Sequence, residues 1–474
     1  MKLSENNYAK YVDDDVFKKI SYVSELLNQE VYVVGGFVRD VLISRLSNDL
    51  DFVTLGSGII FAEKTAELLN VQSVSIFKNF GTAQIKTNDW EFEFVGARKE
   101  SYDRKSRKPK VEDGTFEDDI HRRDFTINTL AISLQKNDFG SLIDTFNGLM
   151  DLENKIIRTP LNPTITFQDD PLRMMRAIRF ATQLDFEIEP LTKKSLSTEV
   201  KSLSIISQER ITEELNKIIL STKPSIGFKY LFDSKLLHEF FPEMVKLQGV
   251  EVKEGKGHKD NFYHTLQVLD QTCQRTDDLW VRWAAILHDI AKPPTKRFVK
   301  GEGWTFHGHE DKGSRMVKPI FSKLKLPLGA PMKKVRALVQ LHLRPIALSK
   351  EDITDSAIRR LIFDAGEHLD DLMILCKSDI TTKNKLKEQR FQKNLKNVER
   401  NIALVEERDR IRNWQPPIKG DEIMKLFNIK PGKEIGMIKT ALKDAILDGV
   451  IPNNYNDAFN FVIEQGKKLG LQIQ

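Results

Sequence analysis

The sequence predicts an α/β domain with a mixed sheet in its N-terminal part and an almost entirely helical remainder. Between residues 30 and 150, short apolar runs alternate with turns and helical stretches, which is the pattern of an α/β domain. Beyond residue 170, apolar residues recur at helical spacing along most of the chain. A chain of 474 residues is long enough to form three or four domains.

Short apolar runs bounded by turns define the strands that we expect in the first domain. A mixed sheet is predicted because helical stretches separate some of these runs and only turns separate others. The five predicted strands are Val31–Val34, Leu50–Thr54, Ala83–Lys86, Phe92–Val95 and Thr129–Leu134.

Helical periodicity defines the remainder, for which we predict five helices: Arg173–Leu184, Ser207–Leu220, His264–Gln274, Leu279–Ala291 and Lys333–Leu343. Pro242 and the polar stretch 251–260 mark a boundary within it. Near the end, a long charged helical tract stops at Pro416 and Pro417. We therefore expect four parts, called head, neck, body and tail below, at residues 1–150, 151–245, 246–400 and 401–474.

Composition indicates a globular protein without a disulfide framework or a membrane span. Hydrophobic residues make up 40% of the chain and charged residues 30%, which is enough for cores and for solubility. The spacing of Cys273 and Cys376 fits neither a disulfide framework nor a zinc finger. The first ten residues lack an apolar signal core, and no apolar stretch is long enough to span a bilayer. We therefore expect a cytoplasmic protein with no membrane partner.

Two glycines and two aspartates form the most informative pattern of the head. Gly35 and Gly36 close the first strand and let the backbone turn sharply and approach a ligand closely. Asp49 and Asp51 begin the next strand, where side chains alternate, so both carboxylates project from one face. Two hard oxygen ligands favour Mg²⁺, especially when substrate phosphates complete its coordination. The alternative is a pair of solvated carboxylates at the start of a strand.

Five short motifs follow one another between residues 35 and 211. They are Gly35–Asp40 with Asp49–Asp51, His121–Asn128, Ile143–Gly148, Asp169–Phe180 and Ser207–Ile211. In residue identity and order they resemble the motifs of the class II tRNA nucleotidyltransferases, the CCA-adding enzymes, and of their bacterial poly(A) polymerase relatives in the DNA polymerase beta superfamily. The resemblance implies a catalytic nucleotidyltransferase head, a helical neck that selects the nucleotide and binds RNA, and a helical tail that binds RNA.

The same resemblance implies nucleotidyl transfer, in which an RNA 3′-hydroxyl attacks the α-phosphate of a nucleoside triphosphate and pyrophosphate leaves. One Mg²⁺ would lower the pKa of the hydroxyl, and a second would steady the leaving oxygens. Asp49 and Asp51 are the expected catalytic ligands. Glu93 stands where the family has its third carboxylate, but Glu91 has the same facing on the predicted strand and competes with it.

Further motif residues are expected to bind the nucleotide. Guanidinium groups suit phosphate oxygens, and an Asp or Asn side chain suits a ribose hydroxyl. Four such side chains lie in the second motif, namely Arg122, Arg123, Asp124 and Asn128. The alternative for these four is a surface charge cluster at a helix start. The resemblance adds Gly35, Gly36, Arg39, Arg176 and Arg179 to the expected nucleotide site.

Base selection without a nucleic-acid template would depend on Asp170 and Arg173. Cytosine and adenine both present an amine donor beside a ring-nitrogen acceptor, so one carboxylate and one guanidinium can pair with either. The two residues lie three apart at a predicted helix start and share a face, and the resemblance assigns them this role. Alternatively, Asp170 before Pro171 is an ordinary N-cap that needs no ligand. Asp169 replaces the family's usual glutamate, which we expect to alter the support of the pair.

A basic stretch runs from Arg98 to Lys110, with seven Lys or Arg residues and two acidic residues. Such a charge run is usually a solvated loop. Its place between the first and second motifs resembles the flexible segment with which these enzymes switch from cytidine to adenosine addition. This disfavours an enzyme that adds cytidine alone, and Phe80-Gly81-Thr82 favours the CCA-adding branch over the poly(A) polymerases.

A second constellation lies in the body, where six of the nine histidines fall between residues 258 and 342. The adjacent His288 and Asp289 resemble the HD phosphohydrolase superfamily. A mixed nitrogen and oxygen site suits a transition metal such as Mn²⁺, Ni²⁺ or Co²⁺, and two cations bridged by Asp289 could activate water. The alternative is a surface or satisfied buried histidine. The implied ligands are His264, His288, Asp289, His309, His342 and Asp379.

The sequence therefore predicts a template-independent CTP/ATP:tRNA nucleotidyltransferase that adds or repairs the 3′-terminal CCA of tRNA and carries an HD phosphohydrolase domain. Its expected partners are tRNA, ATP and CTP, with Mg²⁺ in the head. One alternative is a poly(A) polymerase that uses ATP on RNA 3′ ends. Others are a metal-dependent phosphohydrolase whose head only binds RNA, and an RNA-binding protein with a decayed site. The oligomeric state, the activity of the HD domain and its substrate stay open.

Overall fold

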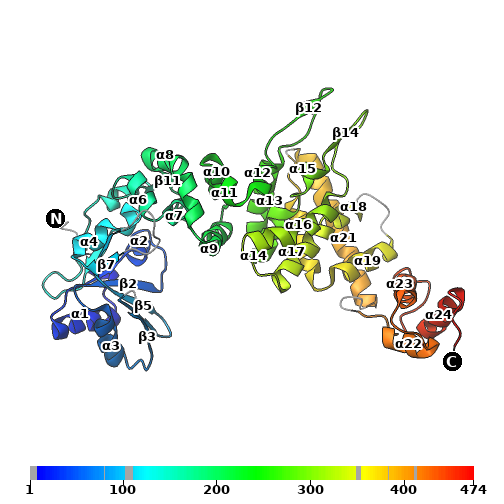
Figure 1. The fold of residues 1–474 in the computed structure, drawn as a ribbon, viewed down its shortest axis with the longest axis horizontal. Helices are drawn as coiled ribbons and strands as arrows, with labels where there is room; N and C mark the ends of the chain where they lie inside the picture. The colour runs from blue at the N-terminus through cyan, green and yellow to red at the C-terminus, as the bar shows by residue number, and fades with distance from the viewer. Residues whose placement is uncertain are drawn as a thin grey trace. The chain divides into compact units, whose positions relative to one another are not determined.

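The computed structural model describes residues 8–78, 81–101, 110–348, 354–382, 384–409 and 414–473 (Figure 1). Phe80 and residues 102–109, which belong to two of the sequence predictions, lie outside the described residues. The chain divides into two compact units, Met1–Pro242 and Glu243–Gln474. The finer division into four functional parts stays a prediction.

A mixed sheet organises the first unit, as predicted, and it has seven strands where five were predicted. Its strand order is β3-β4-β5-β2-β1-β8-β9. Strands β2 and β5 run parallel, whereas every other neighbouring pair in this sheet is antiparallel. The strands are β1 (Val31–Val34), β2 (Asp49–Thr54), β3 (Val74–Phe77), β4 (Thr82–Lys86), β5 (Glu91–Gly96), β8 (Ala131–Ser133) and β9 (Leu142–Ile143).

Alternation along β2 and β5 separates the core from the opposite face of the sheet. Phe52 on β2 and Phe94 on β5 are fully buried, and their rings stack with centroids 4.8 Å apart. Helix α3 packs on this apolar side of β4 and β5 and against α1. Because side chains alternate, the acidic residues of both strands face the other way. A packed aromatic core thus fixes where the carboxylates point.

Helices dominate the rest of the first unit, and α7 packs on both α9 and α10. The short parallel pair β10 (Ile156–Ile157) and β11 (Glu187–Ile188) interrupts the predicted all-helical pattern. The helices are α1 (Asp15–Leu27), α2 (Gly36–Leu42), α3 (Gly58–Leu69), α4 (Phe116–His121), α5 (Gly148–Glu153), α6 (Pro163–Asp169), α7 (Leu172–Leu184), α8 (Pro190–Thr198), α9 (Gln208–Ile219), α10 (Ser225–Asp233) and α11 (Leu236–Phe240), with the 3₁₀ turn η3 (Thr126–Asn128).

The second unit is mainly helical, as predicted. Its helices are α12 (Pro242–Val245), α13 (Asn261–Cys273), α14 (Leu279–Leu287), α15 (Lys292–Thr295), α16 (His309–Lys323), α17 (Ala330–Leu341), α18 (Arg344–Leu348), α19 (Asp355–Ala365), α20 (Leu369–Ser378), α21 (Lys385–Asp409), α22 (Gly420–Phe427), α23 (Lys433–Leu447) and α24 (Tyr455–Lys468). No helix in the described part of the chain combines the length and the apolarity that crossing a bilayer requires.

Two β-hairpins correct the prediction of a purely helical body. Strands β12 (Val252–Lys253) and β13 (Lys256–Gly257) form one, and β14 (Arg297–Val299) and β15 (Gly303–Thr305) form the other. Each turns at a glycine with positive φ, Gly255 at +71° and Gly301 at +90°, a conformation that side chains rarely allow. Figure 1 shows both hairpins extending beyond the helices of the second unit. Their strands are too short for an alternating apolar pattern to reveal them.

The last three helices enclose a small core of their own. Ile423, Ile438, Leu442 and Val462 are buried in it. Arg360 on α19 holds α23 through ion pairs with two carboxylates, Asp444 at 3.1 Å and Asp448 at 2.8 Å. Within the predicted tail, these helices therefore form a three-helix unit that packs on α19.

Candidate active site and metal centre

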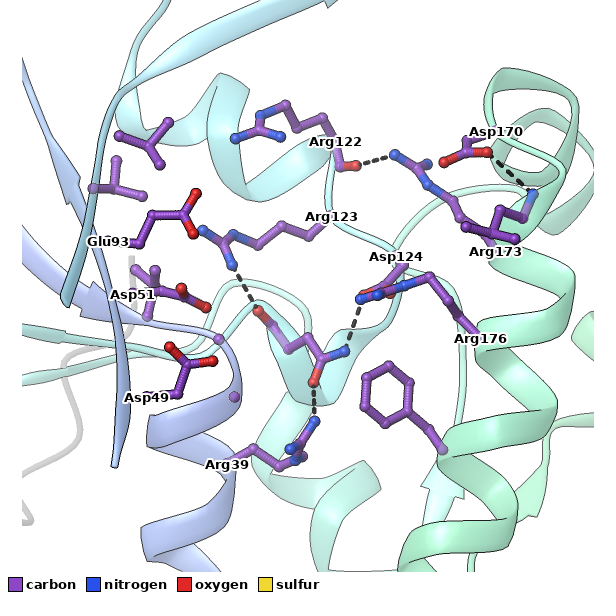
Figure 2. A pocket seen from close by; sticks show the side chains of 18 of the residues that line it. Arg39, Asp49, Asp51, Glu93, Arg122, Arg123, Asp124, Asp170, Arg173 and Arg176 are labelled. Carbon is purple, nitrogen blue, oxygen red and sulfur yellow. Dashed lines mark hydrogen bonds and ion pairs between the residues drawn. The ribbon is translucent and has the colours of Figure 1, made fainter. Parts of the chain in front are cut away.

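Three acidic side chains of the sheet line one side of a cavity of about 530 Å³ in the first unit (Figure 2). Asp49 and Asp51 project from the same face of β2, as predicted. Across the parallel ladder, Asp51 is the register partner of Glu93, and Asp49 is the partner of Glu91. The sheet pairing thus brings together side chains that lie more than forty residues apart in the sequence.

The structure distinguishes the two glutamates that the sequence left in competition. The Glu91 carboxylate forms an ion pair with Lys86 and is not part of the cavity wall. Glu93 lines the cavity and accepts a hydrogen bond from Gln84 Nε2 at 3.0 Å. Glu93 therefore lies beside Asp51 and has room for a ligand, whereas Glu91 already has a cationic partner.

Burial makes the carboxylate forms of Asp49 and Asp51 costly. Burial raises the pKa of Asp51 to about 6, with Arg123 opposing the shift and Asp49 and Glu93 adding to it. The pKa of Asp49 is also raised, first by burial and then by Glu93 and Glu91. Anions that are partly buried and repel one another would be stabilised by a bound cation.

Gly35 lines the cavity at a position where a side chain would crowd Arg123 and Asp51. Its φ is +72°, which favours glycine. A Cβ at this position would lie 3.1 Å from Arg123 Nη1 and 3.5 Å from Asp51 Oδ2. The positive φ fits the sharp turn predicted at Gly35, the predicted close approach to a ligand stays a prediction, and Gly36 begins α2 directly after it.

A chain of buried hydrogen bonds crosses the cavity wall opposite the carboxylates (Figure 2). Arg39 Nη1 donates to Asn128 Oδ1 at 2.9 Å, and Asn128 Nδ2 donates to Asp124 Oδ1 at 2.9 Å. Arg176 Nε then donates to Asp124 Oδ2 at 2.6 Å. Although burial alone would raise it, the pKa of Asp124 falls to about 2 because Arg176 and Asn128 stabilise the anion. The network joins α2 and η3 of the head to α7.

Phe180 gathers three of the predicted arginines around one ring. The guanidinium carbons of Arg39, Arg176 and Arg179 lie 5.0, 5.3 and 4.1 Å from its centroid. Arg179 also forms an ion pair with the buried Glu214 at 2.7 Å. Cation–π contacts of this kind hold guanidinium groups at a cavity wall while their N–H groups stay available to donate hydrogen bonds.

Asp119 is a site residue that the sequence reasoning missed. It is fully buried, and its Oδ1 accepts from Arg122 Nε at 3.0 Å. Its Oδ2 accepts from Arg123 Nε at 3.1 Å and Nη2 at 2.9 Å. Burial opposes ionisation, but the two guanidinium groups lower the pKa of Asp119. Its spacing on α4, three and four residues before the two arginines that follow the end of this helix, is the signal that could have revealed it.

Asp170 and Arg173 both line the same cavity, on the side of α6 and α7. Asp170 Oδ1 accepts from the backbone N–H of Leu172 at 3.1 Å, and its Oδ2 lies 3.5 Å from Arg210 Nη2. Arg173 Nη2 donates to the carbonyl oxygen of Arg122 at 2.5 Å. Helix α7 begins at Leu172 with Pro171 as its N-cap residue, one position later than the predicted cap at Asp170, although Pro171 already has a helical φ of −60° and ψ of −18°. The carboxylate nonetheless caps the helix while facing the cavity.

Asp169, which replaces the family's usual glutamate, is the last residue of α6. Burial raises its pKa, and the nearby Arg173 opposes the shift. The carboxylate of Asp169 therefore interacts electrostatically with Arg173, one member of the predicted base-selecting pair.

All six predicted HD ligands converge in the second unit. They come from α13, the ends of α14, α17 and α20, and the start of α16. Their donor atoms form two groups, and within each group the atoms lie within 4.8 Å of one another. The groups are His264, His288 and Asp379, and Asp289, His309 and His342.

Asp289 lies between the two groups. Its Oδ2 is 3.4 Å from His264 Nε2 and 3.2 Å from His288 Nε2. Its Oδ1 is 3.3 Å from His309 Nε2. Lys292 Nζ donates to Oδ2 at 2.6 Å. One carboxylate thus offers an oxygen to each group, which is the arrangement of a bridging ligand.

Outward hydrogen bonds fix the orientation of the four histidines. The Nδ1 atom of His264 lies 2.9 Å from the hydroxyl of Thr381. The Nδ1 atoms of the other three histidines each contact a backbone carbonyl oxygen. A ring that donates from Nδ1 to a carbonyl turns the lone pair of Nε2 inward, as metal-binding histidines do. The Nε2 atoms of His288, His309 and His342 are buried and make no hydrogen bond within the described residues. These residues fit a centre for divalent metal ions.

Neighbouring charges and burial set opposite pKa shifts in this centre. Burial alone would lower the pKa of His264, but hydrogen bonds to Asp289 and Asp379 raise it to about 9. Burial, together with His288, lowers the pKa of His342 to about 4. The carboxylates thus favour the protonated form of His264, whereas burial and the neighbouring His288 favour the neutral form of His342.

The fold and the two sites define a nucleotidyltransferase head joined to an HD-type helical domain. Family models agree with this class. The model described as poly A polymerase head domain matches residues 31–158. A probable RNA and SrmB-binding site of polymerase A matches residues 185–247, and the HD domain matches residues 261–370.

Two relatives that align over most of their length show the family. The A-adding tRNA nucleotidyltransferase of Deinococcus radiodurans is 32% identical over 342 residues, which cover 70% of this chain and 75% of that protein. The multifunctional CCA protein of Shewanella frigidimarina is 30% identical over 367 residues, which cover 74% and 83%. The chain therefore belongs to the class II CCA tRNA nucleotidyltransferase and bacterial poly(A) polymerase family, and it is a nucleotidyltransferase with an HD domain.

Solved structures support the fold along the whole chain. A Thermotoga maritima CCA-adding enzyme complexed with tRNA aligns over 99% of this chain and all of that chain, with a TM-score of 0.59 and 21% identity. A CCA-adding enzyme in complex with ATP aligns over the same shares, with a TM-score of 0.64 and 23% identity.

Proposed function

We propose that this enzyme adds the 3′-terminal CCA to tRNA, or repairs it, from CTP and ATP and without a nucleic-acid template. One observation carries the proposal. A single cavity holds three carboxylates on one side and, on the other, arginines together with Asp170 and Arg173. The first group suits metal-assisted phosphoryl chemistry, and the second suits the recognition of a triphosphate and its base.

In this proposal Asp49 and Asp51 hold Mg²⁺, with Glu93 as the third carboxylate. Bound Mg²⁺ would lower the pKa of the RNA 3′-hydroxyl and balance the charge of the leaving pyrophosphate. Within the described residues, donor atoms of three side chains meet within 4.8 Å only in the HD centre. Phosphate oxygens of the nucleotide would therefore complete the coordination in the head.

The arginine side of the cavity would bind the nucleotide itself. Arg122 and Arg123 present guanidinium groups to the triphosphate, and Asp124 and Asn128 lie where a ribose hydroxyl can reach them. Asp170 would accept a hydrogen bond from the base amine, and Arg173 would donate to the ring nitrogen. Cytosine and adenine share this pattern, whereas uracil and guanine do not. The remaining motif residues would complete the nucleotide site and fix the positions of its side chains. They are Gly35, Gly36, Arg39, Arg176 and Arg179.

Replacing Asp119 by asparagine is expected to lower kcat/KM for nucleotide incorporation by about 10²-fold, the cost of displacing groups that position a substrate. The change leaves two guanidinium groups without the buried charge that orients them. Steady-state kinetics over a range of CTP concentrations measure the effect, which should fall mainly on KM. The matched control is Glu117→Gln on the exposed side of α4, which should retain wild-type kinetics. A wild-type KM in folded Asp119→Asn protein would exclude the positioning role.

A tRNA that lacks its last three nucleotides tests the nucleotide preference. The purified enzyme should incorporate labelled CTP twice and labelled ATP once and then stop. Long tails made from ATP alone would identify a poly(A) polymerase. The A-adding relative favours a second candidate, an enzyme that adds only the terminal adenosine. That enzyme would extend a tRNA ending in CC and would leave CTP unused on the shorter tRNA.

For the HD domain we infer a phosphohydrolase centre that takes a transition metal such as Mn²⁺, Ni²⁺ or Co²⁺. Four imidazole nitrogens and two carboxylates form a mixed donor set that suits these ions. The neck and the tail would bind the RNA, since an acceptor arm is recognised through its phosphates and its shape. The family match over residues 185–247 supports RNA binding by the neck.

A further inference from the structure

The fifth sequence motif, Ser207–Ile211, has no part in the mechanism proposed above. Its charged residues are Glu209 and Arg210, both in the first turn of α9. A glutamate stabilises this turn, because the N-terminus of a helix carries a partial positive charge, whereas an arginine is disfavoured there. Helix stability therefore does not account for Arg210. The residue instead lines the same cavity as Asp170 and Arg173.

A largely buried ion pair fixes the position of Arg210. Glu214 lies one turn further along α9 and therefore shares a face with Arg210. The Glu214 carboxylate pairs with Arg179 Nε of α7 at 2.7 Å, and the two side chains are 5% and 12% exposed. Helix α9 is thus anchored to the helix that carries Arg173. In this position Arg210 Nη2 lies 3.5 Å from Asp170 Oδ2.

Arg210 contacts the second oxygen of a carboxylate whose first oxygen already has a partner. Asp170 Oδ1 accepts from the backbone N–H of Leu172 at 3.1 Å, and Oδ2 faces Arg210. The neighbouring Arg173 is held differently, by the carbonyl oxygen of Arg122 at 2.5 Å. Because the two contacts of Asp170 come from different helices, α7 and α9, they restrict the rotation of its carboxylate.

Selection of the base depends on where Asp170 and Arg173 lie as much as on their chemistry. Cytosine presents an amine donor and then the ring acceptor N3, and a carboxylate followed by a guanidinium matches this order. Uracil presents a carbonyl, then the N3–H donor, and then a second carbonyl. A shift by one position along this edge would let Asp170 accept from N3–H while Arg173 donates to the second carbonyl. The pair therefore rejects uracil only if the carboxylate stays in place.

We infer that Arg210 is a positioning residue that enforces the discrimination between cytidine and uridine, because it holds the Asp170 carboxylate where the base amine has to be. The inference rests on the base selection proposed for Asp170 and Arg173. Guanine has no second match of this kind, since its amine follows N1–H and would place a donor against Arg173. Loss of Arg210 should therefore weaken the rejection of UTP and leave the rejection of GTP intact. A role in folding alone would not separate the two.

Steady-state kinetics of the full chain test the inference. Values of kcat/KM are measured for CTP and UTP on a tRNA that lacks its last three nucleotides, and for ATP and GTP on a tRNA ending in CC. Arg210→Gln should lower the CTP/UTP ratio about fivefold, which corresponds to about 1 kcal/mol, the upper end for an exposed ion pair. The ATP/GTP ratio should stay at the wild-type value. Arg210→Lys should restore the CTP/UTP ratio, because one N–H group is enough for the contact that Nη2 makes.

The matched control is Glu213→Gln, an exposed change on α9, which should keep both ratios. A wild-type CTP/UTP ratio in folded Arg210→Gln protein, or an equal loss of kcat/KM for all four nucleotides, would overturn the inference. A higher KM for the shortened tRNA with unchanged nucleotide selectivity would also overturn it and would make RNA the partner of Arg210. These outcomes leave the proposed function intact. A wild type that incorporates uridine as readily as cytidine would refute the proposed function itself, and the inference with it.

Discussion

Asp51→Ala is expected to slow nucleotide incorporation by at least about 10³-fold, because a metal that stabilises transition-state charge contributes several kcal/mol. Asp51 lies at the centre of the carboxylate group, between Asp49 on its own strand and Glu93 on the neighbouring strand. Its loss would remove one of the carboxylates that would hold Mg²⁺ in the head. Single-turnover incorporation of labelled CTP into a shortened tRNA measures the rate.

Glu93→Ala and Glu91→Ala form a matched pair for the same assay. Both residues lie on β5 and on the same face, but only Glu93 lines the cavity. Glu93→Ala should lower the rate strongly, and Glu91→Ala should keep it within about twofold, as expected of an exposed ion pair. Equal rates for the two variants would exclude Glu93 as the third carboxylate.

The second large effect is expected for Asp289→Ala, which should empty the HD centre and abolish its hydrolytic activity. The removed carboxylate offers one oxygen to each ligand group, so both metal positions lose a ligand. Elemental analysis after dialysis measures bound Mn²⁺, Ni²⁺ and Co²⁺, and a phosphatase assay measures hydrolysis. Nucleotide incorporation from CTP and ATP should be unchanged, because the head carboxylates and the HD centre belong to different compact units.

His307→Ala provides the control for this prediction. Its side chain is largely exposed and lies two residues before the ligand His309. The variant should keep the wild-type metal content. Retention of stoichiometric metal by Asp289→Ala, or a lack of hydrolysis by the wild type with each of these metals, would contradict the proposed HD chemistry.

Local patterns predicted five of the seven strands of the head sheet, because strand formation depends largely on neighbouring residues, but they did not predict β3 and β9. The alternation that places Asp49 and Asp51 on one face is a property of a single strand. The choice between Glu91 and Glu93 was not accessible in this way. It depends on the pairing of β2 with β5 and on Lys86, which neutralises Glu91 from the adjacent strand.

The features of the site that the sequence did not predict are mostly polar contacts between distant segments of the chain. The hydrogen bonds from Arg39 through Asn128 and Asp124 to Arg176 join segments up to 137 residues apart, since the first and last lie at positions 39 and 176. The contact of Arg39 with the Phe180 ring likewise joins distant segments, whereas Arg176 and Arg179 contact the ring from within α7. For the HD centre, the resemblance indicated all six ligands and a bridging Asp289. The structure adds the distances, 3.2 Å from Asp289 Oδ2 to His288 Nε2 and 3.3 Å from Asp289 Oδ1 to His309 Nε2.

The most direct test of metal-assisted transfer in the head is to map where a divalent ion binds. Fe²⁺ that replaces Mg²⁺ can be oxidised in place, and the radicals that form cleave the backbone next to its ligands. With CTP bound, we expect wild-type fragments that end near Asp51 and near Glu93, and we expect both cuts to disappear in Asp51→Ala. Cleavage confined to the HD ligands, with the head left intact, would contradict the proposed mechanism.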